Sequence, residues 1–534
     1  MSERIRNKER DKDKEKDKIL ILEKGKRGFW QIVFGRTGII LILMLLQFVL
    51  LFLGFGVLGQ YIPYLYSGYL LVSLMLVIYV LNKPKNPAVQ IAWIVLIMAV
   101  PVVGGLLYLF VELQIGHRVL HWEVQEQIKK TREFAKQKAY ILDKIDRQDK
   151  GVGNLVRYMN QYGSFPIYEN THVTYFPLGE DAFEEILVQL EKAKKYIFLE
   201  FFIVNEGYMW GRALKILEEK VKQGVEVRVM YDGTCTLMNL PWRYPKDLKK
   251  LGIKCKIFSP IHPILSTHYN NRDHRKILVI DGKVGFTGGI NFADEYINHK
   301  VRFGHWKDTA VMLEGAAVEN FMLMFLQMWN ISETKPDYTR FLEKKNMEPE
   351  RREGFVMPYG DSPLDNENVG EMVYLDMINR AEQYVHIMTP YLILDYEMLN
   401  ALKFAAKRGV EVVIILPHIP DKKYAFALAK QHYLELIHAG VKIYEYTPGF
   451  IHAKVVVCDG DEAVVGTINF DYRSLYLHFE CAAYMFQCPV IADIEQDVMN
   501  TMQRSHRVTL EDYRKTGFFT KLVGKVLKIL APLM

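Results

Sequence analysis

The pattern of apolar and polar residues occurs twice in the larger, C-terminal part of the chain. Each copy alternates amphipathic stretches with short apolar runs, and the second amphipathic stretch of each copy ends at a glycine. Helical periodicity predicts helices, and short runs rich in β-branched residues predict buried strands. The predicted elements cover 183–194, 196–204, 210–222 and 225–231 in the first copy, and 372–383, 384–393, 396–407 and 410–416 in the second.

The two copies also share short phrases. Residues 224–227 and 409–412 both read Gly-Val-Glu-Val, at the point where a predicted helix gives way to a strand. Strands that alternate with helices indicate βαβ units and a largely parallel, helix-covered sheet. The sequence therefore predicts an α/β fold of two pseudo-symmetric halves, 166–335 and 336–515, that meet in one cleft. The alternative is that duplication only enlarged a scaffold.

Three apolar stretches without a charged side chain precede the repeat, at 37–58, 64–81 and 89–111. A membrane-spanning helix needs about 20 apolar residues, so these lengths predict N-terminal transmembrane helices within 37–115 and a multi-pass protein of the cell membrane. Residues 1–36 carry twelve Lys and Arg against seven Asp and Glu. Such a charged tail is expected on the cytoplasmic side.

The third apolar stretch conflicts with the charges that follow it. A full crossing would place the rest of the chain outside, whereas the predicted helical linker at 116–165 is basic and favours the inside. A helix over this stretch would be weakened near the middle of the membrane by Pro101, Gly104 and Gly105. A kinked or re-entrant segment resolves the conflict and leaves the catalytic domain facing the cytoplasm.

The last residues, 516–534, predict an amphipathic helix. Phe518 and Phe519 are followed by Lys521, Lys525 and Lys528, which alternate with aliphatic residues. This pattern suits a basic helix that lies on anionic headgroups, and it equally suits a helix packed on the protein's own core.

Composition narrows the class of protein without identifying it. Half of the 534 residues are hydrophobic, which excludes disorder along the whole length. The net charge of +6 fits an anionic membrane surface, a nucleic acid or no partner. The five cysteines are scattered without metal-ligand spacing, and neither they nor the Asp, Glu and His residues predict a metal site.

Each copy ends in the same polar motif, His-x-Lys-x-x-x-x-Asp. On a strand the His and Lys point to one face, where an imidazole can act as nucleophile or acid/base and an ammonium can stabilise phosphoryl oxygens. Small residues and an Asn follow, which suit close backbone approach and amide donation to a phosphate. The candidate residues are His274, Lys276, Asp281, Gly289 and Asn291 in the first copy, and His452, Lys454, Asp459, Thr467 and Asn469 in the second.

Carboxylates have two different expected roles. Asp308 and Glu480 follow the two motifs, and we predict that each orients one imidazole. Asp281 and Asp459 each precede a glycine, so they are either catalytic or part of a turn. His268, His305 and His478 are predicted to make local hydrogen bonds.

These motifs resemble those of the phospholipase D superfamily, and from about residue 60 onward the chain resembles the bacterial cardiolipin synthases. The charged tail and the first apolar stretch depart from that pattern. The closer resemblance rests on Asn86-Pro87, Ala92-Trp93, Gly288-Gly289-Ile290-Asn291, Trp306-Lys307-Asp308-Thr309 and the run 469–475.

The resemblance implies two phospholipase D-like halves and phosphatidyl transfer without a metal or cofactor. One histidine would attack phosphatidylglycerol and form a phosphohistidine, and a second phosphatidylglycerol would then accept the phosphatidyl group to give cardiolipin and glycerol. By the superfamily's pattern His274 is the nucleophile and His452 the acid/base. The alternatives are a hydrolase, a nuclease of the same superfamily, which the apolar segments disfavour, and a non-catalytic lipid-binding scaffold. The sequence leaves open whether the protein forms a homo-oligomer.

Overall fold

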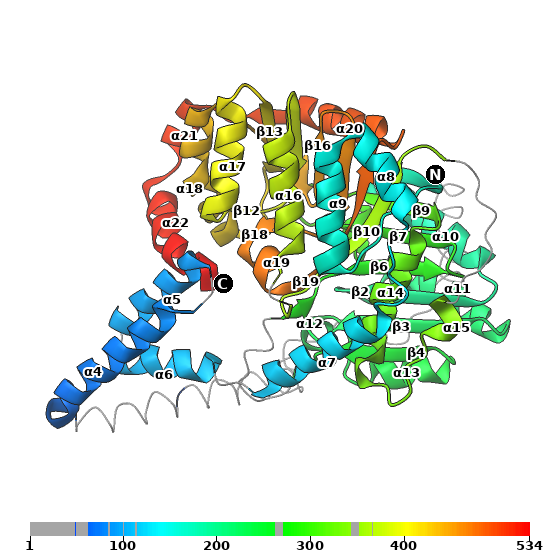
Figure 1. Cartoon of the computed structure of the whole chain (residues 1–534), viewed down its shortest axis with the longest axis horizontal. Coiled ribbons are helices and arrows are strands. Elements are labelled where there is room, and N and C mark those ends of the chain that lie inside the picture. Colours follow the sequence, from blue (N-terminus) through cyan, green and yellow to red (C-terminus); the bar gives the residue numbers. More distant parts are fainter. Residues whose placement is uncertain are drawn as a thin grey trace, which may run out of the picture.

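The computed structural model describes residues 49, 62–83, 86–99, 101–112, 115–261, 271–342, 352–365 and 367–533. Two twisted sheets with helices against them form the body of the molecule, and helices α4 to α6 project from it as an arm (Figure 1). The C-terminal helix lies where this arm meets the body (Figure 1).

The first half contains a seven-stranded sheet in the order β1-β9-β7-β6-β2-β3-β4. Its strands are β1 (Thr171–Phe176), β2 (Tyr196–Phe201), β3 (Glu226–Asp232), β4 (Lys254–Phe258), β6 (Lys276–Ile280), β7 (Val284–Gly288) and β9 (Ala310–Gly315). Its helices are α10 (Gly179–Lys192), α11 (Tyr208–Lys222), α12 (Cys235–Met238), α13 (Tyr244–Lys250), α14 (Val318–Trp329) and α15 (Thr339–Leu342).

The second half has the same strand order, β10-β19-β17-β16-β11-β13-β14, with β20 added at the end. Its strands are β10 (Phe355–Asp361), β11 (Tyr384–Met388), β13 (Glu411–Pro417), β14 (Lys442–Tyr446), β16 (Val455–Cys458), β17 (Glu462–Gly466), β19 (His478–Phe486) and β20 (Ser505–Arg507). Its helices are α16 (Val369–Arg380), α17 (Tyr396–Lys407), α18 (Lys423–Ala439), α19 (Tyr472–Tyr476), α20 (Ile491–Gln503), α21 (Leu510–Lys515) and α22 (Phe518–Leu530). The predicted repeat of strands and helices is therefore confirmed.

The prediction of a largely parallel sheet is wrong, because each sheet is mixed. Strands β2, β3 and β4 are parallel, whereas β2–β6, β6–β7, β7–β9 and β9–β1 are antiparallel. The reason is the length of the connections: β6 and β7 are joined by residues 281–283 alone, which is too short for the crossover that a parallel pair requires.

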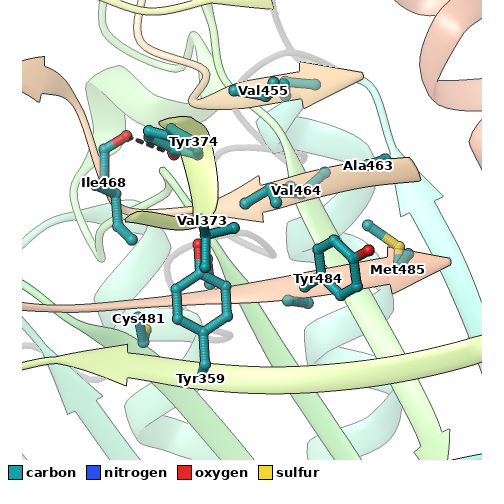
Figure 2. Packing of buried hydrophobic residues seen from close by; sticks show 14 of the residues in the cluster. Tyr359, Val373, Tyr374, Val455, Ala463, Val464, Ile468, Cys481, Tyr484 and Met485 are labelled. Atoms are coloured by element: carbon teal, nitrogen blue, oxygen red, sulfur yellow. Dashed lines mark hydrogen bonds between the residues drawn. The ribbon is translucent and has the colours of Figure 1, made fainter. Parts of the chain in front are cut away.

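Interlocking apolar side chains hold the helices on the sheets. In the second half, Tyr374 of α16 packs over β10, β16, β17 and β19, and its hydroxyl donates to the backbone oxygen of Ile468 at 3.1 Å (Figure 2). Helix α14 is buried on almost every side, since its apolar residues contact the cores of both halves. These contacts make the two halves one packed body.

Two short parallel strand pairs also cross between the halves. Strand β5 (Arg272–Asp273) of the first half pairs with the start of β19, and β8 (His305–Lys307) pairs with β15 (Gly449–Ile451) of the second half. Strand β12 (Leu392–Ile393) pairs with β18 (Phe470–Asp471) within the second half. The crossing pairs stand immediately before the two His-x-Lys motifs.

The N-terminal arm differs from the predicted membrane helices. Residues 89–111 do not form one helix but divide into α5 (Pro87–Ala99) and α6 (Pro101–Glu112), in keeping with the predicted kink at Pro101. Across the described residues, no helix combines the length and apolarity of a membrane span, so the transmembrane helix predicted at 64–81, observed as α4 (Ile62–Leu81), is not confirmed. The stretch 37–58 lies outside the described residues apart from Val49.

The predicted basic linker at 116–165 forms three helices. These are α7 (Ile115–Thr131), α8 (Ala139–Gln148) and α9 (Lys150–Gly163). Buried apolar residues of α8 and α9 join the core of the second half, so this segment is part of the body rather than a free tether.

Asp281 and Asp459 are turn residues and not members of the motif's reactive face. Each has a positive φ, of 55° and 51°, directly after its strand. The Asp281 carboxylate accepts hydrogen bonds from the backbone N–H groups of residues 194–196, and that of Asp459 accepts from those of residues 382–384. Because a strand rises about 3.3 Å per residue, five residues carry Asp281 about 17 Å from Lys276. Of the two roles that the sequence allowed, the contacts of both residues therefore fit the part in a turn.

Replacing Asp459 with Ala should destabilise the protein without touching its chemistry. The change leaves three backbone N–H groups without their acceptor, which costs about 1–3 kcal/mol in the free energy of unfolding. Urea unfolding measures this loss, and the exposed Asp143→Ala change on α8 is the matched control. A variant with intact stability and lost turnover would return Asp459 to the catalytic residues.

Candidate active site

Backbone pairing between the halves brings each histidine to a carboxylate of the opposite half. The His274 N–H donates to the Phe479 carbonyl at 2.9 Å, and the His452 N–H donates to the Lys307 carbonyl at 2.7 Å. The residues that follow these two acceptors in the chain are Glu480 and Asp308. The register of the crossing strands thus places each carboxylate beside an imidazole.

The side chains complete this crossed arrangement. His274 Nδ1 lies 2.9 Å from both oxygens of Glu480, and His452 Nδ1 lies 2.6 Å from Asp308 Oδ2. Both carboxylates are fully buried. An ionised carboxylate only accepts, so Nδ1 donates in each pair and Nε2 is left with its lone pair toward a ligand. The two predicted orienting carboxylates are brought to the imidazoles, each across the boundary between halves.

Each lysine of the two motifs bonds to the backbone of the histidine in its own motif. Lys276 Nζ donates to the His274 carbonyl at 2.6 Å, and Lys454 donates to the His452 carbonyl. Both side chains are buried, and burial lowers their pKa to about 8 and about 7. Two ammonium groups attract an anion strongly in a buried site, because water screens their charge less there.

The histidines are neutral in this environment. Burial, reinforced by the charge of Lys454, lowers the pKa of His452 to about 4. Burial lowers the pKa of His274 well below its usual value, and the charges of Lys276, Lys454 and His452 lower it further. Each lysine therefore acts on the histidine of the other half as well as on its own, which requires all four groups to share one site.

Asp308 is stabilised as an anion by the groups around it. Burial opposes its ionised form, but the charges and hydrogen bonds around it, chiefly from His452 and Lys454, outweigh burial and lower its pKa. An imidazolium on His452 would face this carboxylate directly. Asp308 therefore opposes the effect of burial on His452 and stabilises a proton that this ring gains.

Asn291 and Asn469 occupy equivalent places beside the histidines. Asn291 Nδ2 donates to the Tyr296 hydroxyl, and Asn469 Nδ2 donates to Ser474 Oγ, both at 2.9 Å. Each amide nitrogen has two hydrogens, so one of them stays available for a phosphate oxygen. The Asn469 Oδ1 atom is buried and has no hydrogen-bond partner in the described part of the chain.

Gly289 and Thr467 support the carboxylates. A Cβ atom at Gly289 would come within 3.0 Å of the Asp308 carboxylate, so only glycine leaves that carboxylate its place. The Thr467 hydroxyl donates to Glu480. Both residues thus contact the carboxylates that were predicted to orient the histidines.

Two aromatic residues that the sequence did not single out as site residues flank the histidines. Trp306 lies beside His452 and His478 lies beside His274, each with ring centroids 5.4 Å apart. They occupy equivalent positions, two residues before Asp308 and Glu480, and that shared offset was a usable signal. His305 makes the predicted local hydrogen bond, with Tyr446 at 3.0 Å, while His268 lies outside the described residues.

The local role predicted for His478 corresponds to one long contact with Glu480, and neither ring nitrogen has a partner at ordinary hydrogen-bond distance among the described residues. Its nearest polar group is Glu480 Oε1, 3.7 Å from Nδ1. Donor atoms of His274, His478 and Glu480 fall within 4.8 Å of one another. The Glu480 carboxylate is already hydrogen-bonded to His274 and to the Thr467 hydroxyl, so orientation of the His274 ring accounts for its contacts.

The two halves differ in what surrounds the histidines. Next to His274, Arg275 pairs with Glu200 at 2.5 Å and with Asp273 at 3.1 Å, all three buried. The equivalent residues of the second half are apolar: Ala453, Met388 and Ile451. Ion pairs therefore fix the strand that carries His274, whereas Trp306, Tyr296 and Phe450 pack around His452.

An anion should bind this site more tightly as the pH falls. Sulfate keeps its charge over the range from pH 7 to 5, whereas the imidazoles gain protons, and a bound anion raises their pKa. Proton uptake of one per site strengthens binding by up to about tenfold per pH unit. Calorimetric titrations in two buffers measure affinity and proton uptake, with the exposed His172→Ala variant as control. Binding that is constant or weaker at pH 5 contradicts the assignment.

A methyl group at Gly289 should disable the site through Asp308. Gly289→Ala is expected to lower turnover about 100-fold, as loss of an orienting group does elsewhere, while the folded structure persists. Gly517→Ala is the matched control, because a Cβ there meets nothing within 4 Å. Steady-state rates and circular dichroism of both variants test this, and full activity of Gly289→Ala would refute the role of Asp308.

Comparisons with known proteins agree with the site. The family model described as "Cardiolipin synthase, PLD-like domain" matches residues 186–329 and 374–502, and a model of the phospholipase D-nuclease N-terminal region matches 71–112. The cardiolipin synthase of Geobacillus kaustophilus is 34% identical over 84% of this chain and 90% of its own length. That of Alkalihalophilus pseudofirmus is 32% identical over the same shares.

Two further relatives extend the comparison. An uncharacterised protein of Streptococcus mutans is 52% identical over 86% of this chain and 99% of its own length. The crystal structure of phosphatidylserine synthase from Haemophilus influenzae is similar in fold, with a TM-score of 0.53 and 14% identity over 71% of this chain and 98% of that one. With the duplicated motifs, these findings show that the chain belongs to the bacterial cardiolipin synthases of the phospholipase D superfamily.

Proposed function

We propose that the chain transfers a phosphatidyl group between two phosphatidylglycerol molecules and so produces cardiolipin and glycerol. The observation that carries the proposal is the pair of crossed imidazole–carboxylate hydrogen bonds, His274–Glu480 and His452–Asp308, with a buried lysine behind each ring. The names of the relatives support the lipid substrate and the product.

In the first step His274 Nε2 attacks the phosphorus of phosphatidylglycerol. His452 has taken a proton from solvent on Nε2 when the negative phosphodiester bound. The phosphorus–oxygen bond to the glycerol headgroup breaks, and His452 Nε2 gives this proton to the departing glycerol oxygen. A phosphatidyl group is then bonded to His274. Lys276 and Lys454 offset the charge that develops on the phosphoryl oxygens.

In the second step the phosphatidyl group passes to an acceptor. A hydroxyl of the second phosphatidylglycerol gives its proton to His452 and attacks the phosphorus, and the nitrogen–phosphorus bond breaks. Cardiolipin leaves, and both histidines return to their starting protonation. Each histidine is used twice, so the sequence of steps needs no external acid or base.

The environments of the rings support this division of roles. The Asp308 carboxylate raises the pKa of His452 against burial and the lysine charge, so the negative phosphodiester can bring its ring into protonation. Burial and the charges of Lys276 and Lys454 lower the pKa of His274, which suits a nucleophile that must stay neutral.

Purified protein in detergent, given phosphatidylglycerol with a labelled headgroup and excess chelator, should release glycerol and form cardiolipin. Substituting either His274 or His452 with Ala is expected to lower turnover by at least about 1,000-fold, because each removes a group that acts in both steps. His172→Ala should retain full turnover. Phosphatidic acid as the sole product would identify a hydrolase, and turnover that survives the loss of His452 would refute the mechanism.

A further inference from the structure

The C-terminal helix α22 is attached to the body through its smallest residue. Gly524 faces α18, where an added Cβ would come within 3.0 Å of the Ala427 carbonyl and the Gln431 side chain. Gly524 is the one residue of α22 that is buried. The two helices therefore approach closely along a narrow seam, and most of the surface of α22 faces away from the protein.

The exposed surface of α22 is its apolar one. Val526, at the centre of this surface, is 53% exposed, and Phe518 and Phe519 are 73% and 79% exposed. At 100° per residue the exposed apolar side chains cover an arc of about 140° that excludes Gly524. The residues of this apolar arc are Phe518, Phe519, Leu522, Val523, Val526, Ile529 and Leu530. A helix of a soluble domain usually has the opposite orientation, with its apolar side toward the core.

Positive charge borders the apolar arc. Lys521, Lys525 and Lys528 lie on the side between the arc and the seam, and α22 contains no Asp or Glu. Lys525 and Lys528 are exposed. An apolar arc flanked by lysines is complementary to an anionic lipid surface, because the lysines meet phosphates while the apolar side chains enter the headgroup boundary.

The C-terminal helix also contacts the N-terminal arm. Leu527 and Ala531 at the end of α22 pack in one cluster with Ala88 of α5, and the two helices meet beside the C-terminus in Figure 1. Helix α5 adds Ile91 and Met98, which are 58% and 69% exposed. The N-terminal arm and the C-terminal helix thus meet through buried contacts, and each also presents exposed apolar side chains.

We propose that α22 docks the protein on an anionic lipid surface by inserting its apolar arc at the headgroup boundary. The proposal does not depend on the reaction assigned to the site. It does place the lipid beside α18, whose N-terminal end follows Lys422, a residue close enough to the site for its charge to act on His274.

A fluorescent reporter on the full chain tests the docking. The environment-sensitive dye NBD is attached at Val526→Cys, the centre of the arc, and in a second variant at Lys528→Cys, which faces about 160° away from it on the same helix. The parent chain, labelled in parallel, corrects for the native cysteines. Vesicles contain phosphatidylcholine alone or with an equal part of phosphatidylserine, an anionic lipid that is not the proposed substrate.

With phosphatidylserine present, emission at position 526 should rise about twofold and be quenched by acyl-chain doxyl lipid, as expected for a side chain in the headgroup boundary. Position 528 should change little. The double change Lys521→Gln with Lys525→Gln, made in the Val526→Cys chain, should raise the lipid concentration for half-maximal signal about 30-fold, since each basic residue contributes about 1 kcal/mol. Circular dichroism checks that the labelled chains are folded.

Three outcomes would overturn the proposal. Equal responses at 526 and 528 would mean that the helix does not present one side to the lipid. High emission at 526 without any vesicles would mean that another segment, such as residues 37–58, covers the arc. A signal that grows with protein concentration and not with lipid would identify a second copy of the chain as the occupant.

Discussion

The crossed hydrogen bonds between His274 and Glu480 and between His452 and Asp308 are the constraint on which the rest of the structure depends. Each half supplies a histidine that only the other half can orient. The carboxylates are fully buried, so separating the halves would leave each without its partner, at a cost of several kcal/mol. The site therefore exists only while the halves are packed together.

Backbone pairing between the halves, in addition to side-chain packing, holds these groups in place. The parallel pairs β5–β19 and β8–β15 set the register between the halves, and the residue after each pair is a histidine on one strand and a carboxylate on the other. Within that symmetric frame the halves differ chemically. Buried ion pairs hold the strand that carries His274, whereas apolar residues take the equivalent positions beside His452, so the two imidazoles have unlike surroundings.

Much of this arrangement could be predicted from the sequence, because the same phrases and the same motif occur in both halves. The repeated phrases predicted the two halves, and the doubled motif identified both histidines and both lysines. The pairing of each carboxylate across the halves was not readable, since it depends on the register of two-residue and three-residue strands that carry no local signal. The mixed sheets were missed for a related reason, as an apolar run predicts a strand but not its direction.

Asp281 and Asp459 illustrate a second limit. Both motifs repeat the same spacing from His and Lys to Asp. A catalytic role for Asp explains this spacing, and so does the length of a strand that ends in a turn. Their bonds to three backbone N–H groups each decide between these explanations. In the arm, Pro101 signalled the break between α5 and α6, whereas which side of α22 faces the body depended on one glycine against α18.

The most direct test of the crossed pairs is the nitrogen NMR spectrum of histidine-labelled protein with the carboxylates changed one at a time. A ring that donates from Nδ1 to a carboxylate has a distinctive pair of nitrogen shifts, which single histidine substitutions assign to their residues. Asp308→Asn should move the signals of His452 and leave those of His274, and Glu480→Gln should do the reverse. If Asp308→Asn moves His274 instead, each half orients its own histidine and the account is wrong.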